Sequence, residues 1–415
     1  MTPKIKLRID QIRRGEIPKG YIRTVSGISP TDWKRYTFGD IYTERKEPGS
    51  EELPLLMVSI HSGVSDGEVD EKNLPKKVKR IADKSQYKKA VSGDLVFNMM
   101  RAWQGAIGTV RTTGMVSPAY IVAEPNDTVY PLFMDYYTRT PQMINQIDRQ
   151  SYGVTDFRKR LYWDSFIPIG CILPPVAEQQ KIAAILTTQD KVIELKEKRL
   201  AEKQRQKKYL MQQLLTGKKR LPGFNGAWKV DRLGKLFLER KETNYEGLQM
   251  LAITGAQGII PRKELDLKDN SSEDKSKYLR VCVGDIGYNT MRMWQGISAY
   301  SDYEGIVSPA YTILKPSSSI NAKYFAYLFK TPEIIFLFYR FSQGLVDDTR
   351  NLKYENFKKI KVCYPPDTKE QTAIAEVLSA ADREIGLLRQ DIEQEKQKKK
   401  ALMQLLLTGI VRVKV

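Results

Sequence analysis

Histidine and cysteine are scarce in this chain, and their scarcity argues against two kinds of chemistry. The only histidine is His61, which leaves most zinc sites and most histidine-based catalysis without their usual side chain. The three cysteines, Cys171, Cys282 and Cys363, are odd in number and show no Cys-x-x-Cys spacing. We therefore expect neither a structural zinc nor a catalytic triad.

Long apolar runs are also missing. No stretch of the sequence approaches the roughly 20 apolar residues that cross a bilayer. The basic N-terminus, MTPKIKLRIDQIRRGEIPKG, is not followed by the apolar segment of a signal peptide. We expect a cytoplasmic protein with no membrane contact.

Basic residues, by contrast, are in excess. The chain has 68 Lys and Arg against 49 Asp and Glu, a formal net charge of +19. Such an excess creates a long-range positive field of the kind found on phosphate-binding proteins. A merely soluble basic protein is the alternative, and charge alone does not choose between DNA, RNA and an acidic protein partner.

The chain repeats itself over most of its length. NMMRAWQG (98–105) returns as NTMRMWQG (289–296), with six of eight letters unchanged. Four other pairs keep the same order: 33–47 with 228–242, 84–94 with 275–285, 116–120 with 307–311, and 173–186 with 364–378. LLTG closes both copies, at Gly217 and Gly409. Two long copies indicate domain duplication and not a stacked array of short repeats.

Each copy begins with a globular segment of mixed composition, roughly 28–172 and 223–363. Short runs of β-forming residues between glycines, such as GDLVFNMM and GAIGTV, predict strands. Residues 131–150 and 321–341 have helical apolar spacing, interrupted at the matched Pro141 and Pro332. We therefore predict an α+β fold for each segment.

A long helix is predicted after each globular segment. Positions 182, 186, 189, 193, 196, 200, 203, 207, 210 and 214 alternate by four and three, and positions 374 to 406 repeat this phase. This spacing is typical of a coiled coil, although several of these seam positions are polar. The polar seam suggests helices that need partners for full burial. Gly217 and Gly409 lie where a left-handed helix cap belongs.

The two helices allow two interpretations. One is a plain dimerisation coiled coil. Because both helices belong to one chain, we favour an antiparallel pair within it. From Ile182 to Leu214 the seam would span ~48 Å at 1.5 Å per residue. That length could hold two globular segments about one DNA turn, ~34–36 Å, apart, so duplex DNA is the favoured partner.

These segments, in this order, resemble the specificity subunit of type I restriction–modification systems. The resemblance covers essentially the whole chain, and it rests on the PPxxEQxxIA-like start and the LLTG end of each long helix. It implies two homologous α/β target-recognition domains, separated and joined by two long antiparallel helices with pseudo-twofold symmetry. The implied parts are an N-terminal arm (1–27), the first recognition domain (28–172), the first spacer helix (173–217), a linker with the second recognition domain (218–363), and the second spacer helix with the C-terminal tail (364–415).

The resemblance also implies a role and a set of partners. It implies a non-catalytic subunit whose two domains each read one half of a bipartite duplex DNA site. Two adenine methyltransferase subunits would bind it, and motor–nuclease subunits would join them. No cofactor is expected in this chain, whereas the partner subunits would use S-adenosylmethionine, ATP and Mg. The N-terminal arm would fill the role in one half of the molecule that the linker after Gly217 fills in the other.

One feature departs from the family pattern. The recognition domains of such subunits are usually dissimilar, whereas these two are close relatives. We therefore predict half-sites that are nearly inverted repeats of one another. We expect their differences to follow the residues that differ between the copies: Met99 and Thr290, Ala102 and Met293, Tyr152 and Gln343.

The repeated motif supplies the first candidates for reading DNA. Base edges are read by Arg toward guanine and by Asn and Gln toward adenine. The candidates are Asn98, Arg101, Trp103 and Gln104 in the first copy, and Asn289, Arg292, Trp294 and Gln295 in the second. The alternative is a structural role, because a duplicated core repeats as faithfully as a duplicated site.

A second group of candidates follows the mid-domain helices. SYGVTDFRKR (151–160) matches SQGLVDDTRN (342–351), and both read as loops. The candidates there are Tyr152, Arg158, Lys159, Arg160, Gln343 and Arg350. Their cations suit phosphates, which position a protein without specifying sequence; a solvated basic loop is the alternative.

An enzyme with its own DNA-binding domains is the competing class. The two Pro-Pro pairs lack the preceding Asn or Asp and the following aromatic of an adenine methyltransferase loop, and no GxxxxGK[ST] phosphate loop occurs. Both pairs begin helices, where proline is favoured. The remaining alternative is a stand-alone basic coiled-coil scaffold that binds nucleic acid, RNA included.

Overall fold

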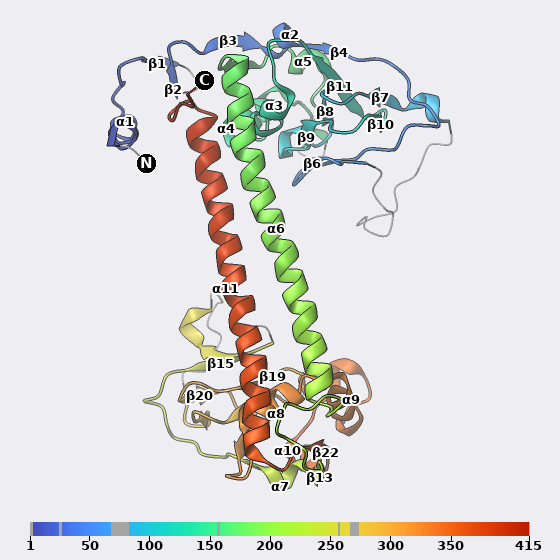
Figure 1. Ribbon diagram of the computed structural model, residues 1–415, viewed down its shortest axis with the longest axis vertical. Helices are drawn as coiled ribbons and strands as arrows, with labels where there is room; N and C mark the ends of the chain where they lie inside the picture. The colour runs from blue at the N-terminus through green and yellow to red at the C-terminus, as the bar shows by residue number, and fades with distance from the viewer. Residues whose placement is uncertain are drawn as a thin grey trace. The chain divides into compact units, whose positions relative to one another are not determined.

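The computed structural model describes residues 3–24, 27–67, 83–155, 158–255, 258–265 and 274–414 (Figure 1). The chain divides into two compact units. Unit 1 comprises residues 1–195 and 392–415, and unit 2 comprises residues 196–391. Each unit contains one strand-rich globular part and a segment of both long helices. The predicted α+β class with two strand-rich domains is confirmed.

Unit 1 is built from short strands and short helices. Its strands are β1 (Tyr21–Thr24), β2 (Gly27–Pro30), β3 (Lys34–Thr37), β4 (Tyr42–Glu44), β5 (Val58–Ser59), β6 (Gly63–Val64), β7 (Lys88–Ala90), β8 (Leu95–Asn98), β9 (Ile107–Thr109), β10 (Gly114–Val116), β11 (Tyr120–Pro125) and β12 (Gly170–Leu173). Its short helices are α1 (Pro3–Arg13), α2 (Phe38–Ile41), α3 (Pro131–Tyr137), α4 (Pro141–Gln150) and α5 (Trp163–Phe166), with 3₁₀ turns η2 (Lys84–Gln86) and η3 (Ala102–Gln104).

Among its described residues, unit 2 repeats the order of strands and α-helices that unit 1 has from β3 to β12. Its strands are β13 (Lys229–Arg232), β14 (Phe237–Glu239), β15 (Leu251–Thr254), β16 (Gly258–Pro261), β17 (Leu279–Val281), β18 (Ile286–Asn289), β19 (Ser298–Tyr300), β20 (Gly305–Val307), β21 (Tyr311–Pro316) and β22 (Lys361–Tyr364). Its short helices are α7 (Leu233–Leu236), α8 (Ala322–Leu328), α9 (Pro332–Phe341) and α10 (Tyr354–Phe357), with 3₁₀ turns η5 (Arg262–Glu264), η6 (Met293–Gln295) and η7 (Asp347–Thr349).

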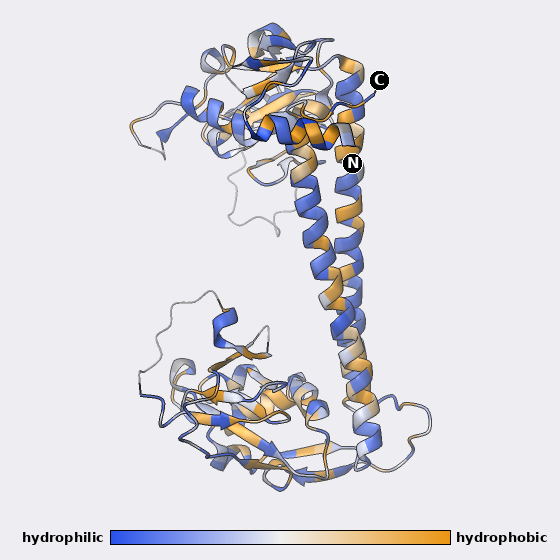
Figure 2. Cartoon of the chain, turned by 90° about the vertical axis from the view of Figure 1, so that its left-hand side faces the viewer, coloured by the Kyte–Doolittle hydropathy of each residue, from blue (hydrophilic) through white to orange (hydrophobic). Residues whose placement is uncertain are grey.

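A four-stranded antiparallel sheet forms the centre of each unit. Its strand order is β4-β11-β8-β9 in unit 1 and β14-β21-β18-β19 in unit 2. In β8, Phe97 belongs to one apolar cluster and Val96 to another, and both are completely buried. A strand covered on both faces needs apolar residues at successive positions. This is why the successive residues Leu95, Val96 and Phe97 are all apolar, and Figure 2 shows the hydrophobic strands at the centre of each globular part.

The matched prolines separate two helices in each unit, as predicted. Pro141 is the first residue of α4 and Pro332 is the first residue of α9. Proline is favoured there because the first turn of a helix leaves its N–H groups without carbonyl partners. The adjacent Thr140 hydroxyl caps α4 by accepting the N–H of Met143 (3.4 Å).

The two long helices, α6 (Val176–Leu214) and α11 (Thr368–Leu406), are present as predicted. Gly217 (φ +70°) and Gly409 (φ +73°) adopt the left-handed conformation that glycine favours after a helix end. The segments of the two helices within one unit lie side by side and run antiparallel (Figure 1). The predicted pairing within the chain is therefore confirmed inside each unit.

Ion pairs and hydrogen bonds between the helices occupy the polar seam positions. In unit 1 the contacts are Gln189 with Glu395 (2.6 Å) and Lys399 with Asp190 (2.5 Å). In unit 2 they are Lys196 with Asp391 (2.8 Å), Lys203 with Glu384 (2.9 Å) and Lys207 with Asp382. The polar residues that weaken the apolar seam thus find partners on the facing helix of the same unit.

The Glu-Gln pair of the repeated PPxxEQ-like segment ties each long helix to its globular part. The Gln179 side chain accepts the N–H of Tyr130 (2.8 Å) and donates to the carbonyl of Pro174 (2.9 Å). Gln371 does the same in unit 2, where it accepts the N–H of Asn321 (2.7 Å). Both glutamines are completely buried. The PPxxEQ-like segment, on which the resemblance rests, therefore attaches the start of each long helix to its globular part.

The glutamate of each pair is held by an arginine that follows the other LLTG. Arg220, on the linker, donates to both carboxylate oxygens of Glu370 (2.6 and 2.7 Å). Arg412, on the C-terminal tail, does the same to Glu178 (2.8 and 2.7 Å). The N-terminal arm contributes the Tyr21 hydroxyl, which donates to the carbonyl of Gly409 (2.8 Å). The arm and the tail therefore share, in unit 1, the role of the continuous linker in unit 2.

Candidate nucleic-acid interface

The turn encoded by NMMRAWQG begins where β8 ends, and its Asn and Trp side chains hold it in shape. The side-chain oxygen of Asn98 accepts the N–H of Met100 (2.9 Å), and the indole N–H of Trp103 donates to the carbonyl of Met100 (3.1 Å). Gly105, with φ +99°, closes the turn in the left-handed region. Asn98 and Trp103 thus act on the backbone of their own loop.

The same turn recurs at the end of β18 in unit 2. The side-chain oxygen of Asn289 accepts the N–H of Met291 (3.0 Å), and the Trp294 indole donates to the Met291 carbonyl (3.0 Å). Gly296 has φ +80°. The four matched side chains therefore have the same partners in both units, which gives this part of the motif a structural role.

The Arg and Gln of the motif lie on the outside of each turn. Arg101 and Gln104 are exposed in unit 1, as are Arg292 and Gln295 in unit 2. None of these four side chains forms a hydrogen bond or ion pair with another described residue. A guanidinium and an amide on a fixed turn provide the donors and acceptors that guanine and adenine edges require.

Two of the residues expected to set the difference between half-sites are buried. Ala102 and Met293 are both completely buried in the main apolar cluster of their unit. Their side chains therefore contact the core of their own unit, and any effect of this difference on the half-sites would act through the shape of the turn. A 3₁₀ helix has three residues per turn, so in each turn the arginine and the glutamine three positions later share the outer face while the residue after the arginine lies in the core.

The second predicted loop lies beside this turn in both units. Tyr152 and Arg160 exchange both backbone hydrogen bonds across it (3.1 and 3.0 Å), as do Gln343 and Asn351 (2.8 and 2.7 Å). The N–H of Leu161, the next residue, bonds to the carbonyl of Met99 (2.9 Å). In unit 2 the matching bond joins Leu352 to Thr290 (2.8 Å). Each unit thus brings its two groups of candidate residues together.

Two of the predicted phosphate-binding cations are engaged within their own unit. Lys159 pairs with Asp148 (2.9 Å) and lies over the ring of Trp103 (5.1 Å). Arg350 pairs with Asp347 (2.8 Å) and lies 4.0 Å from the ring centre of Tyr339. The hydrogen bond to Asp347 raises the pKa of Arg350 above its ordinary value. These contacts stiffen the two loops.

The remaining candidates of this loop are more accessible. Tyr152 is 60% exposed, and its ring lies 5.4 Å from that of Tyr162. Arg158 and Gln343 are exposed, and Arg160 is half-buried. They are therefore placed to contact a ligand that reaches the Arg101 or Arg292 turn.

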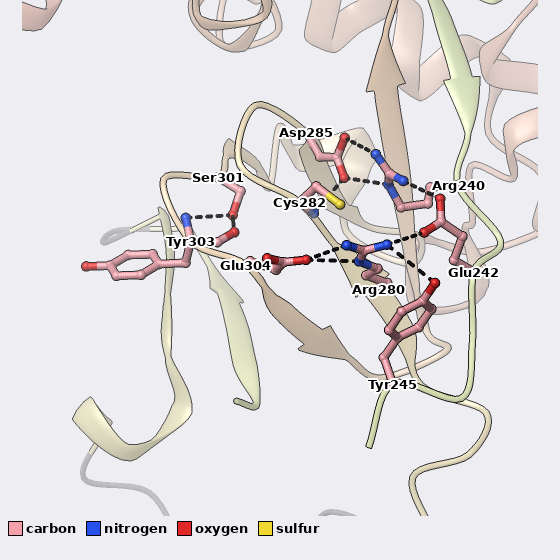
Figure 3. Close-up of polar contacts among 9 residues, drawn as sticks. All are labelled: Arg240, Glu242, Tyr245, Arg280, Cys282, Asp285, Ser301, Tyr303 and Glu304. Carbon is pink, nitrogen blue, oxygen red and sulfur yellow. Dashed lines mark hydrogen bonds and ion pairs between the residues drawn. The ribbon is translucent and has the colours of Figure 1, made fainter. Parts of the chain in front are cut away.

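Each globular part contains an ion network around one buried Arg–Asp pair, Arg45 with Asp94 and Arg240 with Asp285, which the sequence analysis did not identify. In unit 2, Arg240 donates to both oxygens of Asp285 (2.7 and 3.1 Å) and also binds Glu242 (Figure 3). Arg280 links the carboxylates of Glu242 (3.0 Å) and Glu304 (2.6 Å).

The equivalent network in unit 1 uses matched residues. Arg45 binds both oxygens of Asp94 (2.8 and 3.2 Å), and Lys89 binds Glu47 (2.8 Å). Arg45 and Glu47 belong to a repeated Glu-Arg-Lys-Glu, and Asp94 ends a repeated Gly-Asp. The repeated charged residues beside the predicted strands were the sequence feature from which this ion network could have been predicted. In both units this network joins the edge of the central sheet to the turn before its middle strand.

The long helices of the described chain are too polar to cross a membrane. Among known proteins, residues 228–397 match the family model described as the type I restriction modification DNA specificity domain. The MjaVIII type I restriction enzyme specificity subunit of Methanocaldococcus jannaschii is 24% identical over 93% of this chain and 94% of its own length. The MjaX specificity subunit of the same organism is 28% identical over 58% of this chain; that match spans only 59% of the relative.

Two solved structures share the fold. The HsdS subunit from Thermoanaerobacter tengcongensis superposes with a TM-score of 0.51 at 18% identity, over 92% of this chain and 98% of that one. The type I restriction–modification S subunit from M. genitalium gives 0.55 at 13% identity, over 90% and 96%. The family model, the relatives and the shared fold agree with the order of segments read from the sequence. Residues 228–397 thus match a type I restriction modification DNA specificity domain, and most of the chain is similar in sequence and fold to type I restriction–modification specificity subunits.

Proposed function

We propose that the chain recognises a bipartite site in duplex DNA, with one half-site read by each unit. The observation that carries this proposal is the duplicated turn, in which Arg101 with Gln104, and Arg292 with Gln295, are exposed and have no described partner. Burying such groups against apolar protein would leave donors unsatisfied, whereas base edges satisfy them. The net charge of +19 supports a polyanionic ligand.

The two half-sites are proposed to be nearly inverted repeats. The exposed reading residues of the turns are identical in type, Arg and Gln in both units. The adjacent loops differ at exposed or half-buried positions, where Tyr152 and Arg160 of unit 1 correspond to Gln343 and Asn351 of unit 2. We therefore assign the shared bases to the turns and the differing bases, or differing phosphate contacts, to the loops.

Methyltransferase subunits are the proposed protein partners, and they would carry S-adenosylmethionine; motor–nuclease subunits would bring ATP and Mg. The long helices leave apolar side chains exposed, among them Leu195 (56%) and Tyr209 (47%) on α6 and Leu387 (67%) on α11. Because the seam already joins the helices within each unit, these side chains are available to another protein. They are the proposed contact for the methyltransferase.

Selection of bound duplexes from a randomised pool tests the DNA proposal. We expect a two-part motif with a fixed gap when methyltransferase subunits are present. Arg101→Ala should degrade one half of the motif and Arg292→Ala the other, at a cost of about 1–3 kcal/mol each. Arg205→Ala, an exposed arginine on α6, is the matched control and should leave both halves intact.

The competing function is a stand-alone nucleic-acid scaffold. It is favoured only by the charge and the long helices, which any polyanion-binding coiled coil would share. A pool without sequence preference, together with equal competition by duplex RNA, would support the scaffold and refute sequence recognition.

A further inference from the structure

Both units expose an apolar side chain at the tip of the second loop. Leu345 is 99% exposed and Val346 is 59% exposed in unit 2, and Val154 is 89% exposed in unit 1. Val154 and Leu345 occupy the same position of their loops, three residues after the matched Ser151 and Ser342. Single exposed apolar residues are common on proteins. Nearly complete exposure of an apolar side chain at the same position in both units, however, indicates a surface that contacts a binding partner.

The tips are held in shape by the residues around them. Gly344, directly before Leu345, has φ +135°, and a Cβ there would lie 2.6 Å from the carbonyl oxygen of Thr349. At Gly153 a Cβ would lie 2.4 Å from the carbonyl oxygen of Arg158. Only glycine permits so close an approach of the two sides of the loop. The apolar tip is therefore presented on a narrow, closed loop.

The charge of the unit 2 loop indicates which part of DNA its tip contacts. Residues 342–351 contain two aspartates and one arginine, and that arginine, Arg350, is engaged by Asp347. In unit 2 a loop of this charge is a poor ligand for phosphates, whereas the matched loop of unit 1 also carries Arg158, Lys159 and Arg160, which suit phosphates beside its tip. Within a groove, however, a carboxylate can accept a hydrogen bond from the amino group of cytosine, and apolar side chains can contact bases.

The position of the loop brings the tip to the same ligand as the reading turn. The loop that carries Leu345 is joined to the turn by the Leu352–Thr290 backbone bond (2.8 Å). It is also joined through Tyr339, which contacts both Arg350 (4.0 Å) and Trp294 (6.2 Å between ring centres). A duplex read by Arg292 and Gln295 would therefore lie against the apolar tip.

We propose that the tips are wedges that enter between adjacent base pairs, one base step in each half-site. This proposal rests on the proposed function, DNA recognition. An apolar side chain inserted in this way partly unstacks the step and kinks the duplex by about 20–90°. The wedge of unit 2, Leu345 with Val346, is larger than that of unit 1, where Thr155 follows Val154. The half-site read by unit 2 is therefore the more strongly unstacked.

The test uses the full chain with its methyltransferase subunits and a duplex from the selection described above. The fluorescent base 2-aminopurine replaces one base at a time along both half-sites, because its emission rises when it is unstacked. The variants are Leu345→Ser with Val346→Ser in unit 2, Val154→Ser in unit 1, and Leu345→Phe, which keeps the wedge apolar. Leu238→Ser is the matched control, because Leu238 is also a largely exposed leucine (63%) of unit 2 and lies on β14.

We expect one bright position in each half-site with the unchanged chain. The double serine variant should abolish the signal in one half-site, with affinity reduced by about tenfold, while Leu345→Phe and Leu238→Ser should keep it. Val154→Ser should abolish the signal in the other half-site. Tight, sequence-specific binding without any bright position, or a bright position that survives the serine variants, overturns the wedge. Absence of sequence-specific binding by the unchanged chain overturns the proposed function itself. Loss of assembly with the methyltransferase in the serine variants would show that the tips bind protein and would equally overturn the wedge.

Discussion

The substitution Arg412→Ala tests how much the contacts of the C-terminal tail, together with the N-terminal arm, stabilise unit 1. Arg412 binds both oxygens of Glu178, which is 1% exposed, and both oxygens of Asp32 (2.7 and 2.8 Å), which is more exposed. It also lies over the ring of Trp33 (5.9 Å). Arg412→Ala would leave the buried Glu178 with the N–H of Val413 (3.3 Å) as its one remaining described partner.

The magnitude follows from the burial of the carboxylate. Removing one partner of a fully buried ion pair costs about 3–5 kcal/mol. The side chain of Arg412 is 31% exposed, so water can reach the vacated space. We therefore expect unit 1 to lose about 2–3 kcal/mol, with the exposed Asp32 adding less than about 1 kcal/mol. Arg220→Ala should destabilise unit 2 by a similar amount, because Glu370 is 2% exposed and equally bound.

Hydrogen exchange followed by mass spectrometry is the suitable assay, because two units that open separately do not give a single unfolding free energy. A loss of 2–3 kcal/mol corresponds to exchange roughly 30–150-fold faster. In Arg412→Ala the acceleration should include residues 409–414, because Arg412 anchors this segment to Glu178. Adding Glu178→Gln should restore part of the protection, because an amide is less costly to bury than a carboxylate. Unchanged exchange in Arg412→Ala, or further loss on adding Glu178→Gln, would refute this reasoning.

Three further predictions concern other parts of the chain. Arg240→Met should destabilise unit 2 by about 3–5 kcal/mol, because Asp285 is 2% exposed and loses its bidentate partner; chemical denaturation followed by unit-specific exchange measures this. Burial raises the pKa of the Cys171 thiol to about 12, so the native thiol should resist alkylation at pH 8 while the exposed Cys363 reacts, as peptide mapping would show. The pKa of the Cys171 thiol is higher in the folded chain than its ordinary value near 9.0. Its contribution to stability is therefore complete below pH 9 and is lost as the pH rises toward 12. Denaturant midpoints should fall across this pH range, and they should fall less in Cys171→Ala.

The repeated motif NMMRAWQG contains residues with structural roles and residues that are free to bind a ligand, and repetition alone does not distinguish the two kinds. Asn98 and Trp103 are repeated because they bond to the backbone of their own turn, whereas Arg101 and Gln104 are repeated without any described partner. In the sequence these four residues look alike, since each is polar or aromatic and each returns 191 positions later. Hydrogen-bond partners separate them, and partners depend on the folded backbone.

The sequence by itself determined the duplication, the α+β class, the long helices with their glycine caps, and the resemblance to type I restriction–modification specificity subunits. These features follow from local rules: apolar periodicity, the restricted φ of proline, and the freedom of Gly217 and Gly409.

Tertiary structure alone decided that Ala102 and Met293 are core residues, that Arg412 takes the place of Arg220, and that the apolar tip at Leu345 is left uncovered. Each of these depends on which distant segments meet. Burial and ion pairing are properties of the assembled chain, because they arise when residues far apart in the sequence exclude water together.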